Sequence, residues 1–186
     1  MTLRVVSRRL VLTLRALVAG YVSLAASAAW CAEESAPRFE APWWGPQSAT
    51  LYTGFYGLRG PQQWNDGFVG LELRGGSFWW DLHVMSGALT ASDGSAYFYL
   101  GVIADIPVGN VVHLMLSFAP GGYAAGSTYD LGYPLIFRST AAAAFAVTPG
   151  VWLGLSFSHM SNGKLAHENP GVETLSVTVT VLALPY

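Results

Sequence analysis

The sequence predicts an all-β protein, an eight-stranded antiparallel outer-membrane β-barrel. Three observations predict this fold. The chain opens with a segment typical of export signals, only 11% of its 186 residues are charged, and apolar and polar residues alternate along most of the remainder. Soluble domains carry about 25% charged residues, so this chain has too few charges to cover a surface exposed to water. Alternation with a period of two is the signature of strands.

The first 29 residues are interpreted as a signal peptide, because basic residues, an apolar stretch and small residues follow one another there. An N-terminal membrane anchor is the alternative. Cys31 lies close to the expected cleavage site, but Trp30 stands where a lipoprotein signal needs a small residue. Residues 30–49 form a lead-in rich in Pro and Trp, and residues 50–186 form the predicted barrel.

Export changes the charge of the chain. Cleavage near residue 29 would remove four of the nine basic residues and none of the eleven acidic ones, which leaves a net charge of −6. Proteins that bind nucleic acid need a basic surface to neutralise phosphates, so we expect no nucleic-acid partner. With one cysteine, the chain forms no disulfide framework.

The barrel is predicted from eight segments. Apolar and polar side chains alternate clearly in most of them, and the first and the last two complete the set: 51–59, 68–74, 78–84, 96–105, 112–118, 129–138, 149–161 and 173–186. Turn signals lie between them: Gly60-Pro61, Gly75-Gly76, Asp93-Gly94, Gly109-Asn110, Pro120-Gly121-Gly122 and Pro149-Gly150. After the signal, no apolar run is long enough for a transmembrane helix.

Alternate positions along a strand share one face, and we call each such set of positions a parity. In these segments one parity is continuously apolar and the other carries the charges. In a membrane barrel the apolar face meets lipid, whereas in a soluble barrel it faces inward. The scarcity of charge favours the membrane barrel, and a soluble lipocalin-like barrel is the alternative. An interior formed by eight strands is just wide enough for side chains, so we expect no pore.

The candidate site lies where the last two predicted strands meet. His159 and Ser161 continue the apolar parity of one strand, and Glu173 begins that of the other. Polar groups on a face that meets lipid are costly and suggest a function. A hydroxyl, an imidazole and a carboxylate within reach are the parts of a hydrolytic triad, in which the base removes the hydroxyl proton and the acid orients the base.

The loop between these strands contains two further candidates, Asn162 and Asn169, which could donate hydrogen bonds to a developing oxyanion. Each residue also has a simpler interpretation. A single His-x-Ser is usually structural, and Asn-Gly and Asn-Pro-Gly are ordinary turn sequences. The catalytic interpretation depends on all these residues occurring together with matching parity.

The stretch from Ser158 to Thr174 resembles the lipid A 3-O-deacylase (PagL) family of outer-membrane esterases. The resemblance rests on an ordered set of residues, His159-x-Ser161-Asn162-Gly163, Asn169-Pro170-Gly171 and Glu173. It implies an eight-stranded barrel that hydrolyses the acyl chain ester-linked at the 3-position of lipid A. Over the rest of the chain the resemblance is architectural.

The resemblance also implies roles for individual residues. Ser161 would be the nucleophile, His159 the base and Glu173 the orienting acid. Asn162, Asn169 and Gly163 would lie around the oxyanion and substrate. Such a hydrolysis needs no cofactor and no metal.

An exported barrel with an even number of strands has both termini in the periplasm, which would place this site in the outer leaflet. Lipid A of lipopolysaccharide, within the lipid of a Gram-negative outer membrane, is then the expected partner, and the sequence leaves a homodimer open. Two rival functions remain. One is a non-catalytic small barrel that acts as a structural protein or adhesin, and the other is an acyltransferase.

Overall fold

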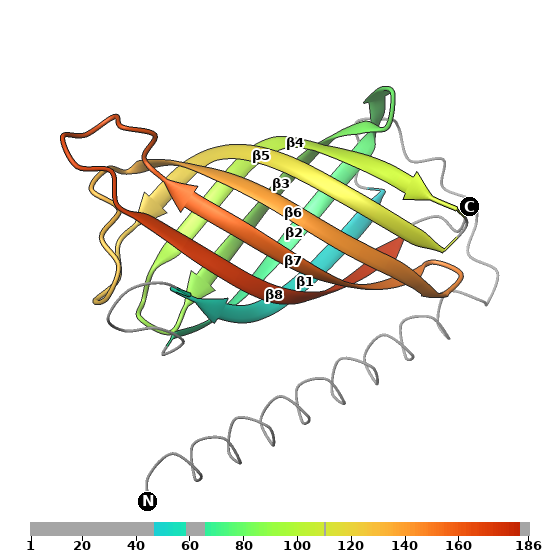
Figure 1. Ribbon diagram of the computed structural model, residues 1–186, viewed down its shortest axis with the longest axis horizontal. Coiled ribbons are helices and arrows are strands. Elements are labelled where there is room, and N and C mark those ends of the chain that lie inside the picture. The colour runs from blue at the N-terminus through green and yellow to red at the C-terminus, as the bar shows by residue number, and fades with distance from the viewer. Residues whose placement is uncertain (1–46, 59–65, 110, 183–186) are drawn as a thin grey trace, which may run out of the picture. The chain divides into compact units, whose positions relative to one another are not determined.

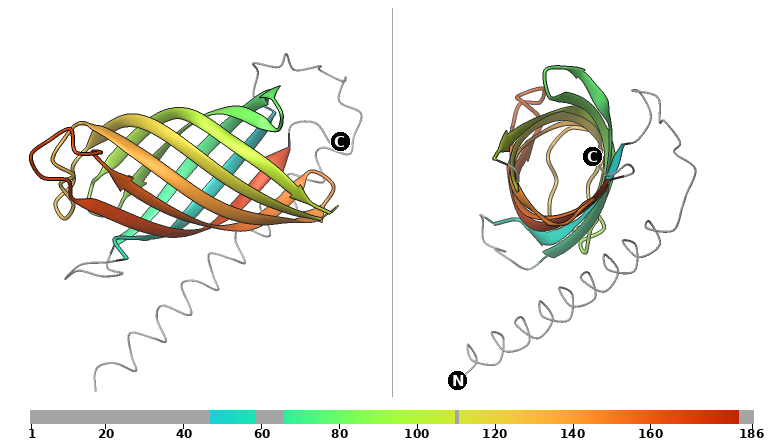
Figure 2. Two further views of the ribbon diagram at one scale, coloured as in Figure 1. Left: turned by 45° about the horizontal axis from the view of Figure 1, so that its top comes forward. Right: turned by 90° about the vertical axis from the view of Figure 1, so that its right-hand side faces the viewer.

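The computed structural model describes residues 47–58, 66–109 and 111–182, which form a closed antiparallel β-barrel. Its eight strands are β1 (Ser48–Tyr56), β2 (Asp66–Trp79), β3 (Leu82–Ala91), β4 (Ala96–Val108), β5 (Val112–Ala124), β6 (Leu135–Thr148), β7 (Val151–Ser161) and β8 (Gly171–Leu182) (Figure 1). Each strand pairs with the next, and β8 pairs with β1 to close the ring (Figure 2). The predicted fold class is confirmed. The predicted signal peptide and most of the lead-in lie outside the described residues.

The two ends of the barrel differ in their connections. Ser48 at the start of β1 pairs with Leu182 at the end of β8, and we call this end the terminus end. The turns after β2, β4 and β6 are also at the terminus end. The connections after β3, β5 and β7 lie at the opposite end, which we call the loop end (Figure 1). Residues 162–170, between β7 and β8, therefore belong to the loop end.

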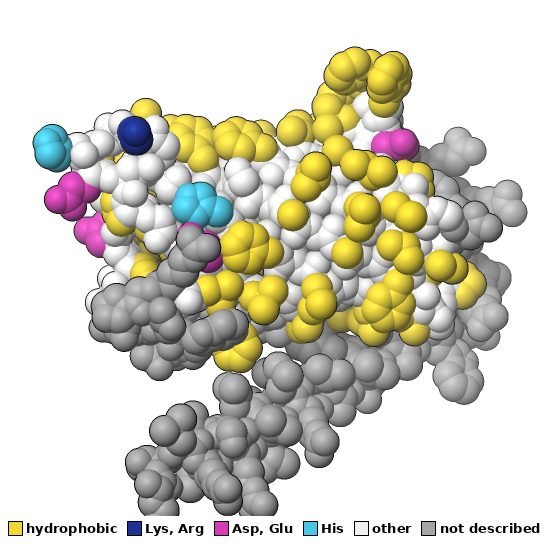
Figure 3. Space-filling model, in the orientation of Figure 1, with side chains coloured by type: hydrophobic (Ala, Val, Ile, Leu, Met, Phe, Trp, Pro, Cys, Tyr) yellow, Lys and Arg dark blue, Asp and Glu magenta, His cyan; other side chains and the backbone are white. Residues whose placement is uncertain are grey.

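The outer face of the barrel is apolar, as Figure 3 shows for one side of it. Along β4 and β5, large apolar side chains such as Phe98, Leu100 and Leu116 are exposed, while the alternate residues Tyr99 and Met115 are buried inside. An exposed apolar band on a closed barrel is the surface that meets lipid. In the described ranges, no helix has the length and hydropathy required to cross a membrane.

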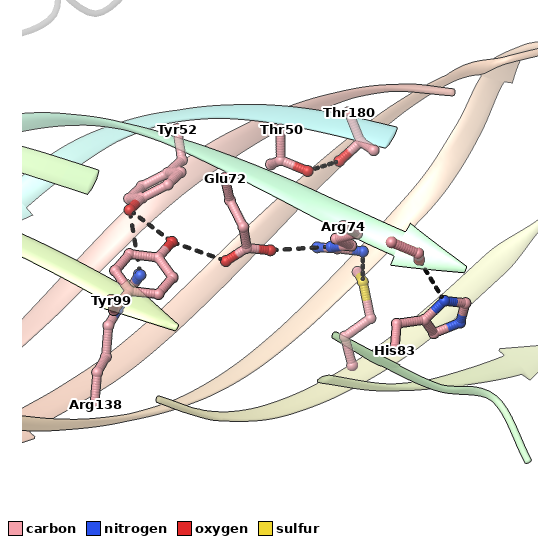
Figure 4. Close-up of polar contacts among 10 residues, drawn as sticks. Thr50, Tyr52, Glu72, Arg74, His83, Tyr99, Arg138 and Thr180 are labelled. Atoms are coloured by element: carbon pink, nitrogen blue, oxygen red, sulfur yellow. Dashed lines mark hydrogen bonds and ion pairs between the residues drawn. The ribbon is translucent and has the colours of Figure 1, made fainter. Parts of the chain in front are cut away.

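The middle of the barrel is filled by a network of charged and phenolic side chains (Figure 4). Arg138, only 3% exposed, donates a hydrogen bond to the hydroxyl of Tyr52 (3.3 Å) and lies over the rings of Tyr52 and Tyr99. The Tyr99 hydroxyl donates to Glu72 (3.0 Å), which also accepts a bond from Arg74 (2.9 Å). Because buried charges are costly without partners, this connected network stabilises a filled interior.

A cavity of about 560 Å³ opens at the terminus end and is lined in part by His83, Asp105 and His113. The His113 Nδ1 is hydrogen-bonded to Asp105, and the His83 Nδ1 lies 3.1 Å from the carbonyl oxygen of Gly75. These two histidines therefore have interior partners, and they lie at the opposite end of the barrel from His159.

Several predicted strand boundaries were wrong. The predicted segment 78–84 contains a turn at Trp80 and Asp81, which both have positive φ angles of 35° and 28°. The predicted segment 129–138 is mostly loop, and β6 runs from Leu135 to Thr148. The second half of β6 contains a run of alanines. Such a run shows no alternation of apolar and polar residues, so the strand could not be recognised in the sequence.

Two predicted turns, at Gly75-Gly76 and at residues 120–122, lie inside β2 and β5. The first coincides with a register shift between Arg74 and Ser77, so its glycines mark a bulge. In the second, a Cβ atom at Gly121 would clash with the carbonyl oxygen of Phe98 on β4 and would lie 2.6 Å from the ring of Tyr97. That glycine makes room for the backbone of β4 and for an inward tyrosine, and it does not turn the chain.

Candidate active site

The register between β7 and β8 brings together the residues that the sequence singled out. His159 pairs with Glu173, and Ser161 pairs with Gly171. Ser158 and Met160, the alternate residues of β7, are fully buried in the interior. Because successive side chains of a strand point to opposite faces, His159 and Ser161 face away from the interior, at the loop end.

His159 and Glu173 are in contact across the two strands. The Nδ1 atom of His159 lies 3.3 Å from Oε1 of Glu173, and the two side chains are 47% and 13% exposed. A neutral imidazole that donates its Nδ1 proton to a carboxylate keeps a free lone pair on Nε2. The pair therefore has the arrangement in which a carboxylate fixes the tautomer of a histidine base.

Ser161 follows His159 by two residues on the same face, which corresponds to roughly 6.5–7 Å between their Cα atoms. Its side chain is partly exposed. Among the described residues, no hydrogen bond joins its hydroxyl to the imidazole. In proteins without bound substrate, such contacts are often long and tighten when the substrate binds.

Asn162 is fully buried and organises the loop end. Its Nδ2 donates hydrogen bonds to the carbonyl oxygens of Leu131 and Glu168, each at 2.8 Å, and its Oδ1 accepts one from the backbone N–H of Lys164 (2.9 Å). An amide nitrogen has only two protons, and both are donated to protein carbonyls here. Both amide protons of Asn162 are therefore engaged within the protein, and neither is available to a substrate in this structure.

The other two predicted loop residues are more open. Asn169 is exposed on the loop, and Gly163 has a φ of 63° in the left-handed region that glycine tolerates. A Cβ atom at Gly163 would lie 3.0 Å from the ring of Phe137, so this loop packs against an aromatic side chain of β6. Phe137 also pairs with Ser161 in register and stacks on Phe118, with ring centroids 5.8 Å apart.

Sequence reasoning missed two neighbours of the site, Phe137 and Ser139. Ser139 is exposed on β6 and pairs in register with His159. Both residues are outward on the strand beside β7, and a correct assignment of β6 would have revealed them. Ser139 is therefore a second outward hydroxyl next to the imidazole.

The ionisable residues of the β7–β8 loop, Lys164, His167 and Glu168, are all exposed. In the described part of the chain, no group of three or more His, Cys, Asp and Glu side chains is arranged to hold a metal ion.

Comparison with known proteins identifies a family. A family model described as lipid A 3-O-deacylase (PagL) matches residues 34–181. No curated protein matches the sequence. The crystal structure of the outer-membrane enzyme PagL is similar to this structure with a TM-score of 0.59 and 16% identity, over 72% of this chain and 98% of that one. A de novo designed transmembrane β-barrel is similar with a TM-score of 0.52 and 10% identity, over 75% of this chain and 98% of that one.

At these identities the two structures bear on the fold alone, and they agree with the β-barrel described above. The family model covers most of the sequence, including β1 to β7 in full and β8 up to Val181, its penultimate residue. The chain therefore belongs to the lipid A 3-O-deacylase (PagL) family of outer-membrane esterases.

Proposed function

We propose that this protein hydrolyses the 3-O-linked acyl chain of lipid A with Ser161 as nucleophile, His159 as general base and Glu173 as orienting acid. The observation that carries the proposal is the contact between His159 and Glu173 on the outer face of the barrel, two residues from an outward serine. Membership of a deacylase family supplies the substrate class.

The chemistry follows from these three groups. Nε2 of His159 takes the proton of the Ser161 hydroxyl while its oxygen attacks the ester carbonyl, and Glu173 stabilises the imidazolium that forms. The imidazolium then protonates the sugar oxygen as the C–O bond breaks, which leaves an acyl-enzyme. A water molecule, deprotonated by the same imidazole, attacks that ester. The fatty acid leaves and the serine regains its proton.

The tetrahedral intermediates carry a negative oxygen that needs hydrogen-bond donors. The exposed amide of Asn169 and the backbone N–H group of the exposed Gly163 are the proposed donors. The Asn162 side chain, with both amide protons bonded to carbonyls, would instead hold the loop that carries these donors.

The position of the site favours a lipid substrate in the leaflet at the loop end. His159 is exposed on a face that is largely apolar, where a lipid ester could reach it without entering the barrel. In an exported barrel the loop end faces the exterior, and lipid A occupies that leaflet.

Mass spectrometry of lipid A from cells with and without the protein tests the proposal. We expect the wild type to remove one 3-O-linked hydroxyacyl chain. We expect Ser161→Ala and His159→Ala each to lower this activity by roughly 10⁴-fold or more while migrating as folded, heat-modifiable barrels. An added acyl chain would indicate an acyltransferase, and unchanged lipid A would indicate a structural protein or adhesin.

Ser139→Ala is the matched control, because Ser139 is an outward serine that pairs with His159 on its other side. It should keep wild-type activity. If Ser139→Ala were inactive and Ser161→Ala active, the nucleophile would be misassigned.

A further inference from the structure

Gly171 lies at the centre of the proposed site, although the sequence presents it as part of a turn. It is the first residue of β8, it is exposed on the outer face, and it pairs in register with Ser161. Glu173 follows it by two residues and therefore projects from the same face of the strand. Gly171 and Glu173 thus stand opposite Ser161 and His159.

The imidazole of His159 occupies the space that a side chain at position 171 would fill. A Cβ atom built on Gly171 would lie 2.6 Å from Cε1 of His159, 3.3 Å from Nε2 and 3.5 Å from Nδ1. The Nδ1 edge of the same ring contacts Glu173. The ring therefore extends along β8 from Glu173 towards Gly171, the register partner of Ser161.

We propose that Gly171 is a positioning residue for the hydrolysis, and this inference rests on the proposed function. Its missing side chain lets the imidazole lie against β8, so that Nδ1 stays on Glu173 while Nε2 is turned towards the serine. Any Cβ atom at position 171 would push the ring off the strand, which would break its contact with Glu173 and misdirect Nε2.

The backbone at this position would accept alanine. Gly171 is not among the residues with positive φ, so an L-residue fits its conformation. The atoms that a Cβ would meet belong to the ring of His159, which can rotate away, and not to the backbone. Gly171→Ala should therefore fold as a barrel and lose the alignment of its site.

The test compares purified full-length wild type and Gly171→Ala in detergent micelles with lipopolysaccharide as substrate. We expect kcat to fall by about 10²-fold with KM unchanged, because misplacing a catalytic group by about 1 Å has effects of this size. Gly122→Ala is the matched control. Gly122 is an exposed strand glycine on β5, and a Cβ atom there would have nothing within 4 Å. It should retain the wild-type kcat.

A second readout does not depend on the lipid. A fluorophosphonate probe labels an activated serine, and we expect its rate at Ser161 to fall in Gly171→Ala by the same factor as kcat. If the wild type is labelled at Ser161 without deacylating lipid A, the proposed substrate fails, while slower labelling of Gly171→Ala still supports the role of Gly171.

Other outcomes would overturn the inference. Wild-type kcat and labelling in Gly171→Ala would show that the glycine positions nothing, while leaving the proposed triad intact. A loss of activity that only matches a loss of heat-modifiable folded protein would make its role structural. If Ser161 of the wild type were neither labelled nor required for deacylation, the proposed function and this inference would fail together.

Discussion

Nδ1 of His159 lies 3.3 Å from Oε1 of Glu173, its register partner on the neighbouring strand. This contact exists because both residues lie on the outer face of an antiparallel pair, where directly opposite side chains are close neighbours. A protonatable pair on a surface that meets lipid needs a functional explanation, and the proposed triad supplies one.

Removal of the Glu173 carboxylate should weaken the base without abolishing it. We expect Glu173→Ala to lower kcat, yet to retain about 10- to 100-fold more activity than Ser161→Ala, because the acid is often the smallest contributor of a triad. Deacylation assays on purified protein measure this ratio. Glu168→Gln, an exposed acid in the nearby loop, should stay fully active. Equal activity in Glu173→Ala and wild type would remove the acid from the triad.

The two loop asparagines should separate stability from catalysis. Asn162→Ala leaves the carbonyl groups of Leu131 and Glu168 without their donor, and we expect it to cost about 1–3 kcal/mol of unfolding free energy. Asn169→Ala should leave stability unchanged and lower kcat by about 10²- to 10³-fold, the cost of losing an oxyanion donor. Urea unfolding with lipid vesicles, paired with activity assays, checks both. The opposite pattern would exchange the two roles.

Arg138 should matter for stability, although it is remote from the outer face. Arg138→Ala removes hydrogen bonds to Tyr52 and Ser158 and leaves space in a filled interior, and we expect a loss of about 3 kcal/mol. The midpoint of urea unfolding reports this loss. Lys164→Ala, which removes an exposed loop cation, should change stability by less than about 0.5 kcal/mol. Unaltered unfolding of Arg138→Ala would mean that the network stabilises little.

A charge on the lipid face should be costly where the same charge in a loop is not. Leu155, on β7, and Leu165, in the loop that follows, are similarly exposed at 59% and 49%. We expect Leu155→Arg to destabilise the barrel in lipid by about 2–4 kcal/mol. Leu165→Arg should have little effect on the same measurement. Equal costs for the two variants would contradict a membrane-embedded β7.

The architecture and the pairing of the site could be predicted from the sequence because both depend on parity. Alternation from Val151 to Ser161 assigns His159 to the outer face, and a short loop to the next strand places Glu173 opposite it. The family resemblance then supplied chemical roles that parity does not contain.

What could not be predicted depends on packing between strands. In the sequence, Gly121 and Gly171 both have the appearance of turn residues. The structure shows instead that the ring of Tyr97 lies beside Gly121 and that the imidazole of His159 lies over Gly171. Likewise, Asn162 resembles an available donor until its two carbonyl partners from Leu131 and Glu168 are known. Each of these contacts joins residues far apart in the chain or on different strands, and the local pattern carries no trace of it.

The sideways exposure of His159 has a consequence for how the enzyme would meet its substrate. A reactive group on the flank of a barrel encounters molecules that drift past within one sheet of lipid, so collisions occur in two dimensions. The turnover rate would then depend on the surface density and the lateral mobility of the substrate lipids. A stiffer membrane, in which lipids diffuse more slowly, would lower this rate without any change in the protein.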